Sequence, residues 1–585
     1  MVQIKIDSFG GEIPAIDDRL LPGNQAASSV NAWLFSGRIE PVHSLVPLYT
    51  PNNPSIRSWF RLPKGNPGID NMIDSDWLEF ENQNVRVIRS PVAGQDDDGR
   101  FYWADGVYPK YMTGDMIRAH DAPYKLGIPR PATAPGVTAT GGSSTDNKTV
   151  TYVYTWVSSL GEEGPPSPPT IITNKPDATY HITMTAPTGI DTANRSLAKT
   201  RIYRTVVGAQ GLASYFFVAE VPIATLTYDD SQTDAQVVLN EQLKSVYWTA
   251  PPSDLQGLVS MPNGMVAAWR KNEIWFCEPY YPHAWPVTYT IAVPNNIVGL
   301  GVFNQSLIIL TEGQPYSATG VDPASMALAI IQPLEPCTSR NSIVNTPSGV
   351  LYSSPNGLIN ITPAGAQNIT AQSILKDQWA KYLNLDSIAA SVLAAGYYAY
   401  SIQVPGVFQD DAFQDNAFQK ESAFGTLPGI YQKLDDPRMG LTVLDPTPVE
   451  TKNVITDIFN GETMVMRDGV IYVVDIRKHE NYGKYIWRSR IYTLDFVANL
   501  GAAKVYWIKS ADESLRSTFR VYAGEYSDLE QDGLKLRFQQ EMTDPNQTFR
   551  LPSGYKALYW QFEVEGYATV LAIHAASSPR ELRAI

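Results

Sequence analysis

Cysteine is nearly absent from this sequence, which has two cysteines, Cys277 and Cys337, among its 585 residues. So few thiols exclude a disulfide scaffold and paired Cys-x-x-Cys zinc ligands, and they favour a reducing compartment. Charged residues are also scarce, at 18%, while hydrophobic residues make up 44%. This balance excludes intrinsic disorder, which requires low hydrophobicity and high charge.

Basic clusters are missing as well. The chain has no run of three consecutive Lys or Arg residues, and 59 acidic against 45 basic side chains leave a net charge of −14. Proteins that grip DNA use clustered cations, so we expect neither tight nor sequence-specific DNA binding. An acidic surface is still compatible with a passage through which double-stranded DNA slides, because like charges do not adhere.

Long hydrophobic runs are absent too. The longest weakly polar stretch, residues 387–404, contains Gly396 and Gln403 and is typical of a strand that follows a turn. The first residues lack the apolar region of a secretory signal peptide. We therefore expect a soluble chain with no membrane span.

Catalytic motifs are lacking. The sequence has no Gly-x-Ser-x-Gly, no Walker A loop and no complete Gly-x-Gly-x-x-Gly. His479-Glu480 begins a zincin motif, but Gly483 stands where its second histidine would be. His283, which lies among aromatic residues and prolines, is interpreted as structural. We expect no catalytic residue, no metal ion and no cofactor. The 59 carboxylates leave a glycosidase pair in a propeller open, but no spacing in this sequence identifies one.

One acidic turn, residues 94–99, has a spacing close to that of a calcium loop. Asp96, Asp98, Gly99 and Asp105 fall at EF-hand-like positions, but Gly94 stands at the first ligand position and Asp105 at the place of the final Glu. We favour an acidic turn over a calcium site.

Glycine, proline and large aromatic residues are abundant, with 41 Gly, 43 Pro, 32 Tyr and 13 Trp. This mixture is typical of many short strands joined by tight turns, so the composition predicts an all-β fold. A chain of 64.6 kDa is too long for one hydrophobic core. We divide it into four segments: an N-terminal β platform with the first propeller strands (1–126), a sandwich (127–250), propeller blades (251–484) and a C-terminal β-domain (485–585).

The segment 127–250 predicts a β-sandwich. In the stretch that begins at Val150, alternate residues Val150, Tyr152, Tyr154 and Trp156 share one face of a strand. The loop Gly161-Glu-Glu-Gly-Pro-Pro-Ser that follows resembles fibronectin type III domains, so we expect an immunoglobulin/fibronectin-like unit inserted between proline-rich linkers.

The segment 251–484 repeats hairpins with turns near residues 271, 313, 356 and 396, spaced about 40–43 residues apart. Such a period is typical of the four-stranded blades of a β-propeller. A further hairpin turns at residues 467–469, after an inserted loop (405–440). For 485–585 the alternating strands predict either a second sandwich-like unit or strands that close the propeller.

The inserted loop contains a five-residue repeat that matches neither a helix nor a strand. Its phenylalanines pack either onto neighbouring blades or against another copy of the chain. Pointing into a ring, they would form a gate whose carboxylates repel DNA phosphates. The candidate gate residues are Phe408, Asp410, Asp411, Phe413, Asp415, Phe418 and Phe424.

Three stretches carry a resemblance. The opening runs Phe9-Gly-Gly-Glu-Ile-Pro-Ala-Ile-Asp-Asp-Arg-Leu-Leu-Pro-Gly, then Asn31-Ala-Trp. The blade sequence extends from Met265 to Gln378-Trp379, and the closing part holds Phe549-Arg-Leu-Pro-Ser-Gly-Tyr and Tyr559-Trp-Gln-Phe. In this order they resemble the tail nozzle proteins (tail tubular protein B) of short-tailed bacteriophages, although this chain is shorter and carries the inserted sandwich.

The resemblance implies a structural virion protein rather than an enzyme. It implies a six-fold ring docked on the head–tail adaptor, contacts with tail fibres or tailspikes, and a lumen that conducts or gates the genome. Assembly would take place in the cytoplasm of the bacterial host. The candidate docking residues are Phe9, Gly10, Gly11, Leu21, Pro22, Asn31 and Trp33.

Two other functions remain open at this point. The aromatic and acidic content would also suit a propeller that binds glycans or degrades polysaccharides. A minor head or decoration component is the third possibility.

Overall fold

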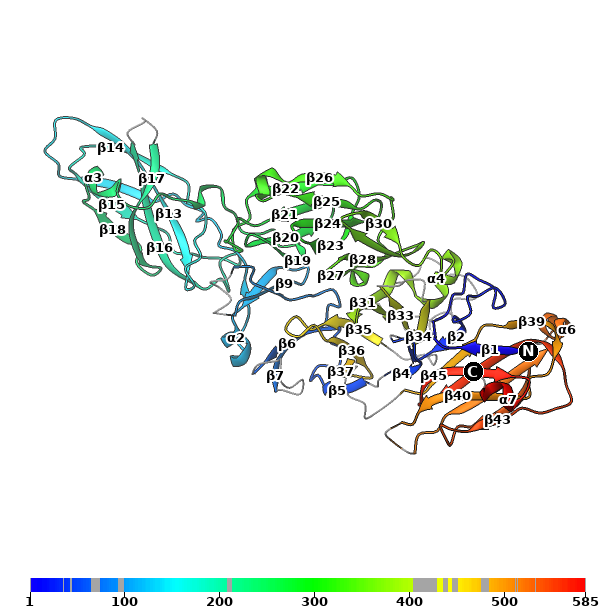
Figure 1. The fold of residues 1–585 in the computed structure, drawn as a ribbon. Coiled ribbons are helices and arrows are strands. Elements are labelled where there is room, and N and C mark those ends of the chain that lie inside the picture. Colours follow the sequence, from blue (N-terminus) through cyan, green and yellow to red (C-terminus); the bar gives the residue numbers. More distant parts are fainter. Residues whose placement is uncertain are drawn as a thin grey trace, which may run out of the picture.

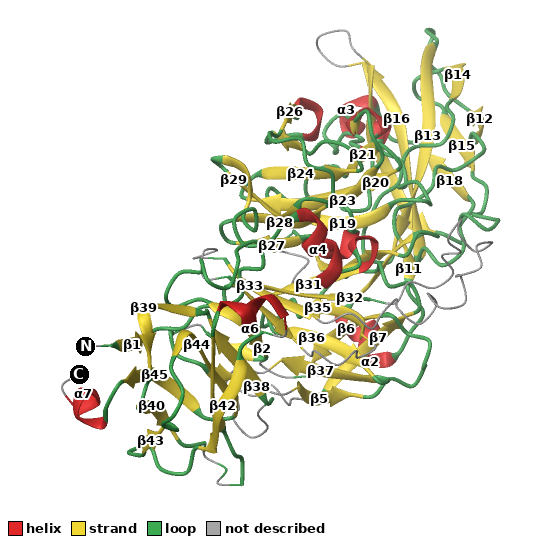
Figure 2. Cartoon of the chain, turned by 90° about the vertical axis from the view of Figure 1, so that its right-hand side faces the viewer, coloured by secondary structure: helices red, strands yellow, loops and turns green. Residues whose placement is uncertain are grey.

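The structure, a computed structural model, describes residues 2–34, 36–42, 45–64, 74–92, 99–207, 213–402, 429–434, 440–444, 451–474, 483–510, 512, 514–531 and 533–583. Nearly all regular elements are strands, which confirms the all-β fold class. Three units follow one another along an elongated molecule (Figure 1): an inserted sandwich, a central propeller, and a second sandwich that holds both termini. Figure 2 shows strands in all three units and only short helices.

Three blades of the propeller are uninterrupted antiparallel meanders of four strands each. Their hairpins lie where the sequence predicts them; for example, Arg270 pairs with Glu273 across a turn in which Lys271 has a φ of 52°. The three sheets consist of β19 (Gln256–Met261), β20 (Met265–Arg270), β21 (Glu273–Phe276) and β22 (Thr290–Ala292); β23 (Ile297–Phe303), β24 (Ser306–Thr311), β25 (Tyr316–Thr319) and β26 (Ala327–Ile330); and β27 (Val344–Thr346), β28 (Gly349–Ser354), β29 (Gly357–Thr362) and β30 (Gly365–Asn368).

The other blades use strands from distant parts of the chain. A blade of β35 (Thr451–Thr456), β36 (Thr463–Arg467) and β37 (Val470–Val474) takes its fourth strand from the N-terminal region, β5 (Leu45–Tyr49). This pairing closes the ring. The remaining sheets of the ring are β6 (Ser58–Pro63) with β7 (Ser75–Phe80); β8 (Ile88–Arg89), β9 (Phe101–Ala104), β10 (Pro109–Met112) and β11 (Tyr124–Lys125); and β31 (Ile388–Leu393), β32 (Gly396–Ser401), β33 (Gly429–Lys433) and β34 (Leu441–Leu444).

The inserted sandwich has two antiparallel sheets of three and four strands around its own core. The face predicted from the alternating pattern is the buried one, since Val150, Tyr152, Tyr154 and Trp156 are at most 5% exposed. The sheets are β12 (Gly136–Thr140), β15 (Thr179–Thr183) and β18 (Thr227–Asp230), and β14 (Thr170–Asn174), β13 (Lys148–Ser158), β16 (Leu197–Val207) and β17 (Ala213–Pro222).

The terminal sandwich packs two sheets around a core that includes Trp487 and Trp560. In one sheet the spatial order of the strands is β1 (Gln3–Ile6), β45 (Thr569–Ala576), β40 (Ala502–Ile508) and β43 (Thr548–Arg550). The other contains β2 (Ala26–Val30), β38 (Tyr485–Ser489), β44 (Ala557–Gly566), β41 (Thr518–Gly524), β42 (Lys535–Glu541) and β39 (Tyr492–Ala498). Because β2 also pairs with β34, a blade of the propeller and this sheet form one continuous ten-stranded sheet.

The short helices lie at the edges of the units. They are α2 (Gly114–Ala119), α3 (Asp234–Val237), α4 (Lys376–Tyr382), α6 (Tyr526–Gln531) and α7 (Pro579–Arg583). In the part of the chain that the structure describes, no helix has the length and apolar character needed to cross a membrane.

Candidate functional site

The blades surround a central cavity of about 370 Å³. The first strands of the sheets line it: β6, β8, β19, β23, β27, β31 and β35 each contribute residues. Neighbouring first strands contact one another around the cavity, for example β19 with β23 and β31 with β35. The cavity is lined by residues from Trp59 to Met464, which are more than 400 positions apart in the sequence.

Arg340 is held in this cavity by a stacked arrangement. Its guanidinium lies 4.6 Å from the centre of the Trp269 ring, and Nη1 donates to Oε1 of Gln256 at 3.4 Å. Gly257, with a φ of 56°, makes room for the indole, since a Cβ there would lie 1.7 Å from a ring carbon of Trp269. The stack therefore requires glycine at position 257.

Arg86 enters the same cavity from the segment before β8. Its Nη2 donates to Oδ1 of Asn453 at 3.2 Å, and its Nη1 donates to the carbonyl oxygens of Gln83 and Val85, both at 3.0 Å. All these acceptors are neutral. The hydrogen bonds orient the guanidinium without neutralising its charge.

The cavity carries an excess of positive charge. Among the described residues that line it, Asp457 is the one carboxylate, and it forms an ion pair with Arg61 at 3.3 Å. Burial lowers the pKa of Arg86 to about 10, and burial together with the charge of Arg86 lowers the pKa of Arg340 to about 9. Two cations that repel each other in a confined space favour an anion as their partner.

This charge pattern does not suit glycoside hydrolysis. That chemistry uses two carboxyl groups on either side of the scissile bond, one as acid and the other as base or nucleophile. The described lining offers Asp457 alone, and Arg61 already engages it. The described part of the lining therefore offers no second carboxyl group beside Asp457, and its charge is predominantly positive.

Four of the predicted docking residues lie inside the molecule. Phe9, Gly10, Gly11 and Leu21 are buried, and the Phe9 ring packs edge-on against Trp487 at a centroid distance of 4.9 Å. The indole Nε1 of Trp487 donates to the Gly10 carbonyl oxygen at 2.9 Å, and these residues are 477 positions apart. The contacts of Phe9 and Gly10 with Trp487 therefore hold the N-terminal segment against the terminal sandwich.

The other predicted docking residues are more accessible. Pro22 is exposed, next to Leu20, which is 74% exposed. Asn31 has a left-handed φ of 49° and, like Trp33, is half-buried; the Trp33 ring lies 4.8 Å from that of Tyr431. A docking role for this segment stays a prediction, and Leu20 and Pro22 are exposed apolar residues on either side of the buried Leu21.

Glu12 is a buried carboxyl at the junction between the N-terminal segment and β34. The backbone N–H of Ser29 donates to its Oε1 at 2.5 Å, and the Tyr382 hydroxyl donates to its Oε2 at 3.3 Å. Burial outweighs these hydrogen bonds and raises the pKa of Glu12 to about 7. This residue lay outside the sequence-based expectations, because nothing in Gly-Glu-Ile-Pro indicates that the glutamate is buried.

The predicted gate residues, Phe408 through Phe424, fall outside the described residues, as do Asp96, Asp98 and His479-Glu480. Asp105 forms an ion pair with Lys110, whose Nζ lies 2.7 Å from a carboxylate oxygen. His283 is buried beside Trp248 and Tyr281, and burial lowers its pKa. No group of three metal-ligating side chains occurs in the described ranges.

Arg86 and Arg340 were not found from the sequence. Single arginines carry no motif, and the ring brings these two together from different blades. A weak local signal is the repeated pair Gly-Leu in the innermost strands of two blades, at Gly257-Leu258 and Gly299-Leu300. Each glycine allows a side chain of another strand or segment to approach closely.

Comparison with known proteins does not name a family. No family model matches the chain, and no curated protein does. Hsv2 of Kluyvelomyces marxianus is 10% identical and covers 63% of this chain and 95% of its own, with a TM-score of 0.22. The extracellular domain of the hybrid two-component system BT3049 from B. thetaiotaomicron is 9% identical and covers 94% of this chain and 78% of its own, with a TM-score of 0.27. TM-scores this low carry no argument about function, so the resemblance to tail nozzle proteins stays a proposal.

Proposed function

We propose that this chain is a structural subunit of a bacteriophage tail. In this proposal six copies form a ring that docks on the head–tail adaptor and conducts or gates the genome, and the protein has no enzymatic activity. It would belong to the virion, after assembly in the host cytoplasm, with tail fibres or tailspikes as further neighbours.

The observation that carries the proposal is the contact between the three stretches that resemble tail nozzle proteins. Phe9 of the opening stretch lies in the same hydrophobic core as Phe549 and Trp560 of the closing part. The opening stretch touches the blade stretch where Nε2 of Gln378 donates to the Pro14 carbonyl oxygen at 2.8 Å. Stretches hundreds of residues apart that pack together form one architectural unit, which is what a shared fold would require.

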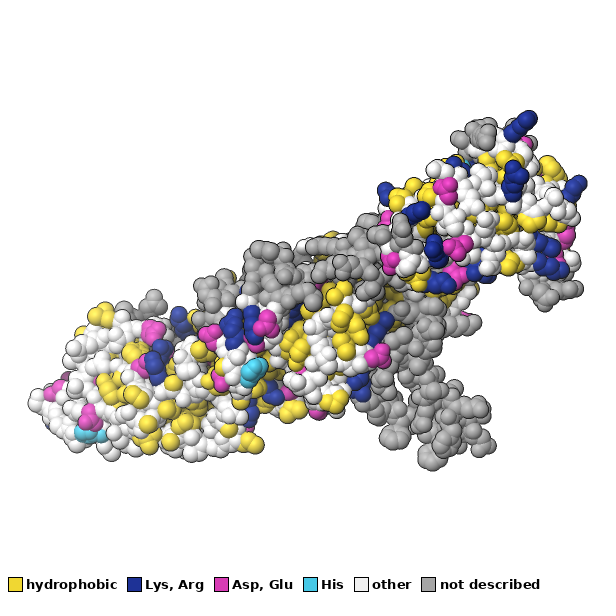
Figure 3. Space-filling model, turned by 90° about the horizontal axis from the view of Figure 1, so that it is seen from below, with side chains coloured by type: hydrophobic (Ala, Val, Ile, Leu, Met, Phe, Trp, Pro, Cys, Tyr) yellow, Lys and Arg dark blue, Asp and Glu magenta, His cyan; other side chains and the backbone are white. Residues whose placement is uncertain are grey.

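The connections between the units also suit a load-carrying particle component. Because β2 continues a blade into the terminal sandwich and β5 closes the ring, the N-terminal segment joins two units at several points. Such pairing resists relative movement more than a single linker does. On the face in Figure 3, acidic and basic side chains are interspersed rather than gathered into a continuous basic surface, which supports passage rather than binding of DNA.

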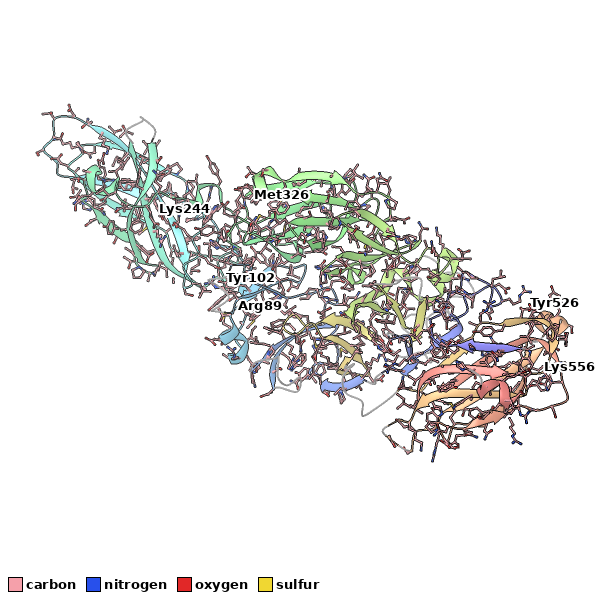
Figure 4. All side chains as sticks on the ribbon, viewed as in Figure 1. Arg89, Tyr102, Lys244, Met326, Tyr526 and Lys556 are labelled. Carbon is pink, nitrogen blue, oxygen red and sulfur yellow. The ribbon has the colours of Figure 1, made fainter. Side chains whose placement is uncertain are left out.

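A neighbouring copy could pack on the outer edge of one blade. All four residues of β26 are exposed, and Leu328 and Ile330, two positions apart and so on one face, are 39% and 54% exposed. Met326 lies at the start of this edge (Figure 4). An edge strand with exposed apolar side chains is a template for association, and ring contacts between identical chains use two different surfaces.

Native mass spectrometry and electron cryo-microscopy of the purified chain test the ring. The expected result is a closed oligomer of six copies that Leu328→Lys with Ile330→Lys converts to monomers of unchanged circular dichroism. Ile190→Lys is the control, because Ile190 is 80% exposed on the inserted sandwich, away from β26. A wild-type chain that stays monomeric alone and with its neighbouring virion proteins, or a single copy per virion, would reject the proposal.

A further inference from the structure

We propose that the central cavity of the propeller is a binding site for a small phosphate-class oxyanion, held between the guanidinium groups of Arg86 and Arg340. The inference is independent of the proposed tail function, because it rests on the cavity alone.

The first argument is that the two guanidinium groups in the cavity present donors suited to a negatively charged ligand. A guanidinium presents its donors in a planar fork that matches the oxygens of phosphate, and two forks from different blades converge on this cavity. The stem of Arg340 fits beside Gly299, where a Cβ would lie 3.5 Å from Cγ of Arg340, and its head is stacked on Trp269. Both arginines are half-buried, and the cavity provides their accessible surface.

The second argument is the missing counter-charge. Ion pairing in the described lining is confined to Arg61 and Asp457, while Arg86 and Arg340 meet neutral acceptors. Their mutual repulsion is part of the reason why the pKa of Arg340 is lowered. Confined charges of one sign are costly without a partner, and an anion between them removes that cost.

A third observation is an unused donor. Trp59 lines the cavity, and its buried Nε1 has no hydrogen-bond partner among the described residues. Buried indole N–H groups usually find an acceptor. An oxyanion in the cavity would offer an acceptor to this indole N–H, which has none among the described residues.

The volume limits the ligand. A cavity of about 370 Å³ falls at the lower end of the range for small-molecule sites. It admits inorganic phosphate or a small phosphate monoester, and it is too small for a nucleic acid segment. Both ligands offer the same tetrahedral oxygens to the two arginines, so the experiment has to separate them.

The test is calorimetric titration of the full chain with inorganic phosphate and, separately, with glycerol 2-phosphate, each against potassium chloride at equal ionic strength. Saturable binding of either ligand is expected, and tighter binding of the monoester would indicate that a larger metabolite is the natural occupant. Arg86→Met and Arg340→Met are each expected to weaken binding by about tenfold or more, the value of a charged hydrogen bond.

Lys244→Met is the matched control, because it removes one positive charge from an exposed position on the distant linker (Figure 4) and should leave affinity unchanged. Arg340→Lys keeps the positive charge but loses the planar pair of donors, so a partial loss of phosphate affinity is expected. This variant replaces Arg340→Met in the test if Arg340→Met does not fold. No saturable binding by the wild-type chain up to about 10 mM, or undiminished binding by the folded arginine variants, would overturn the proposal.

Discussion

Arg61 and Asp457 form an ion pair in which the two side chains are 1% and 2% exposed and Nη1 lies 3.3 Å from Oδ2. Arg61 belongs to β6, and Asp457 follows β35, the first strand of the blade that β5 completes. The pair thus joins the blade that closes the ring to the neighbouring sheet of β6 and β7. Burial raises the pKa of Asp457 more than Arg61 lowers it, so the pair gains little from its charges but is costly to break.

Asp457→Asn should therefore destabilise the chain strongly. The substitution keeps the shape of the side chain but removes the charge of the carboxylate that Arg61 contacts in this buried place, and we expect the free energy of unfolding to fall by about 3–5 kcal/mol. Urea unfolding followed by tryptophan fluorescence measures the change. The double variant Arg61→Met with Asp457→Asn removes both charges and should recover most of the loss.

The matched control for this prediction is an exposed pair on the same hairpin. Lys64 and Asp74 lie 2.9 Å apart with side chains 44% and 79% exposed, so Asp74→Asn should leave the unfolding curve unchanged. If Asp457→Asn behaves like this control, the ring is not held closed by the buried pair.

Glu162 links the inserted sandwich to the propeller. Its side chain is 3% exposed. The carboxylate accepts hydrogen bonds from Nη1 of Arg100 at 3.4 Å and from the Tyr111 hydroxyl at 3.1 Å. Glu162→Ala removes the carboxylate that Arg100 and Tyr111 contact at this buried junction, so we expect a loss of about 3 kcal/mol in unfolding free energy. Glu241→Ala, at an exposed position of the same unit, should have little effect. Equal effects of the two substitutions would show that the junction does not depend on Glu162.

Removal of the whole inserted sandwich should be milder than Glu162→Ala. The chain leaves and re-enters the propeller at one point, since a Cβ on Gly127 would lie 2.9 Å from Cα of Ala250. Replacing residues 129–248 with two glycines should therefore keep the propeller folded, and Arg100 then meets water instead of a buried gap. Circular dichroism and the melting temperature of the deletion variant, beside those of isolated residues 128–250, measure this. Aggregation of both pieces would contradict the prediction.

Local sequence signals predict the hairpins well, because turn residues and alternating strands act over a few positions. The turn at 355–357 and the buried face from Val150 to Trp156 are both present in the structure. The pairing of Gln3 with Ala576 and of Tyr49 with Ile471 spans hundreds of residues, and no local pattern specifies it. The strands of residues 1–126 are consequently shared among both the propeller and the terminal sandwich.

The candidate sites differ in the same way. The resemblance to tail nozzle proteins selected Phe9 as a docking residue, but the sequence could not show that strands from the other end of the chain cover it. Arg86 and Arg340 become a pair only because the ring brings the first strands of different blades around one cavity. Chemistry assembled by long-range topology leaves no motif in the sequence.

The last prediction concerns pH and Glu12. The pKa of this carboxyl rises from an ordinary value of 4.5 to about 7 on folding, so between these values the folded chain holds a proton that the unfolded chain has released. Stability then falls as the pH rises from about 4.5 to about 7, by roughly 3 kcal/mol in total, and this cost is absent below the lower value. Glu12→Gln is neutral at every pH; its amide oxygen can accept the Ser29 N–H, and its amide nitrogen can donate to the Tyr382 hydroxyl. The variant should therefore lack this slope and exceed the wild type in stability at pH 8.

Urea unfolding across pH 4–8 measures both curves, with Glu525→Gln at an exposed position as the control. Parallel curves for wild type and Glu12→Gln would mean that Glu12 stays ionised in the folded chain.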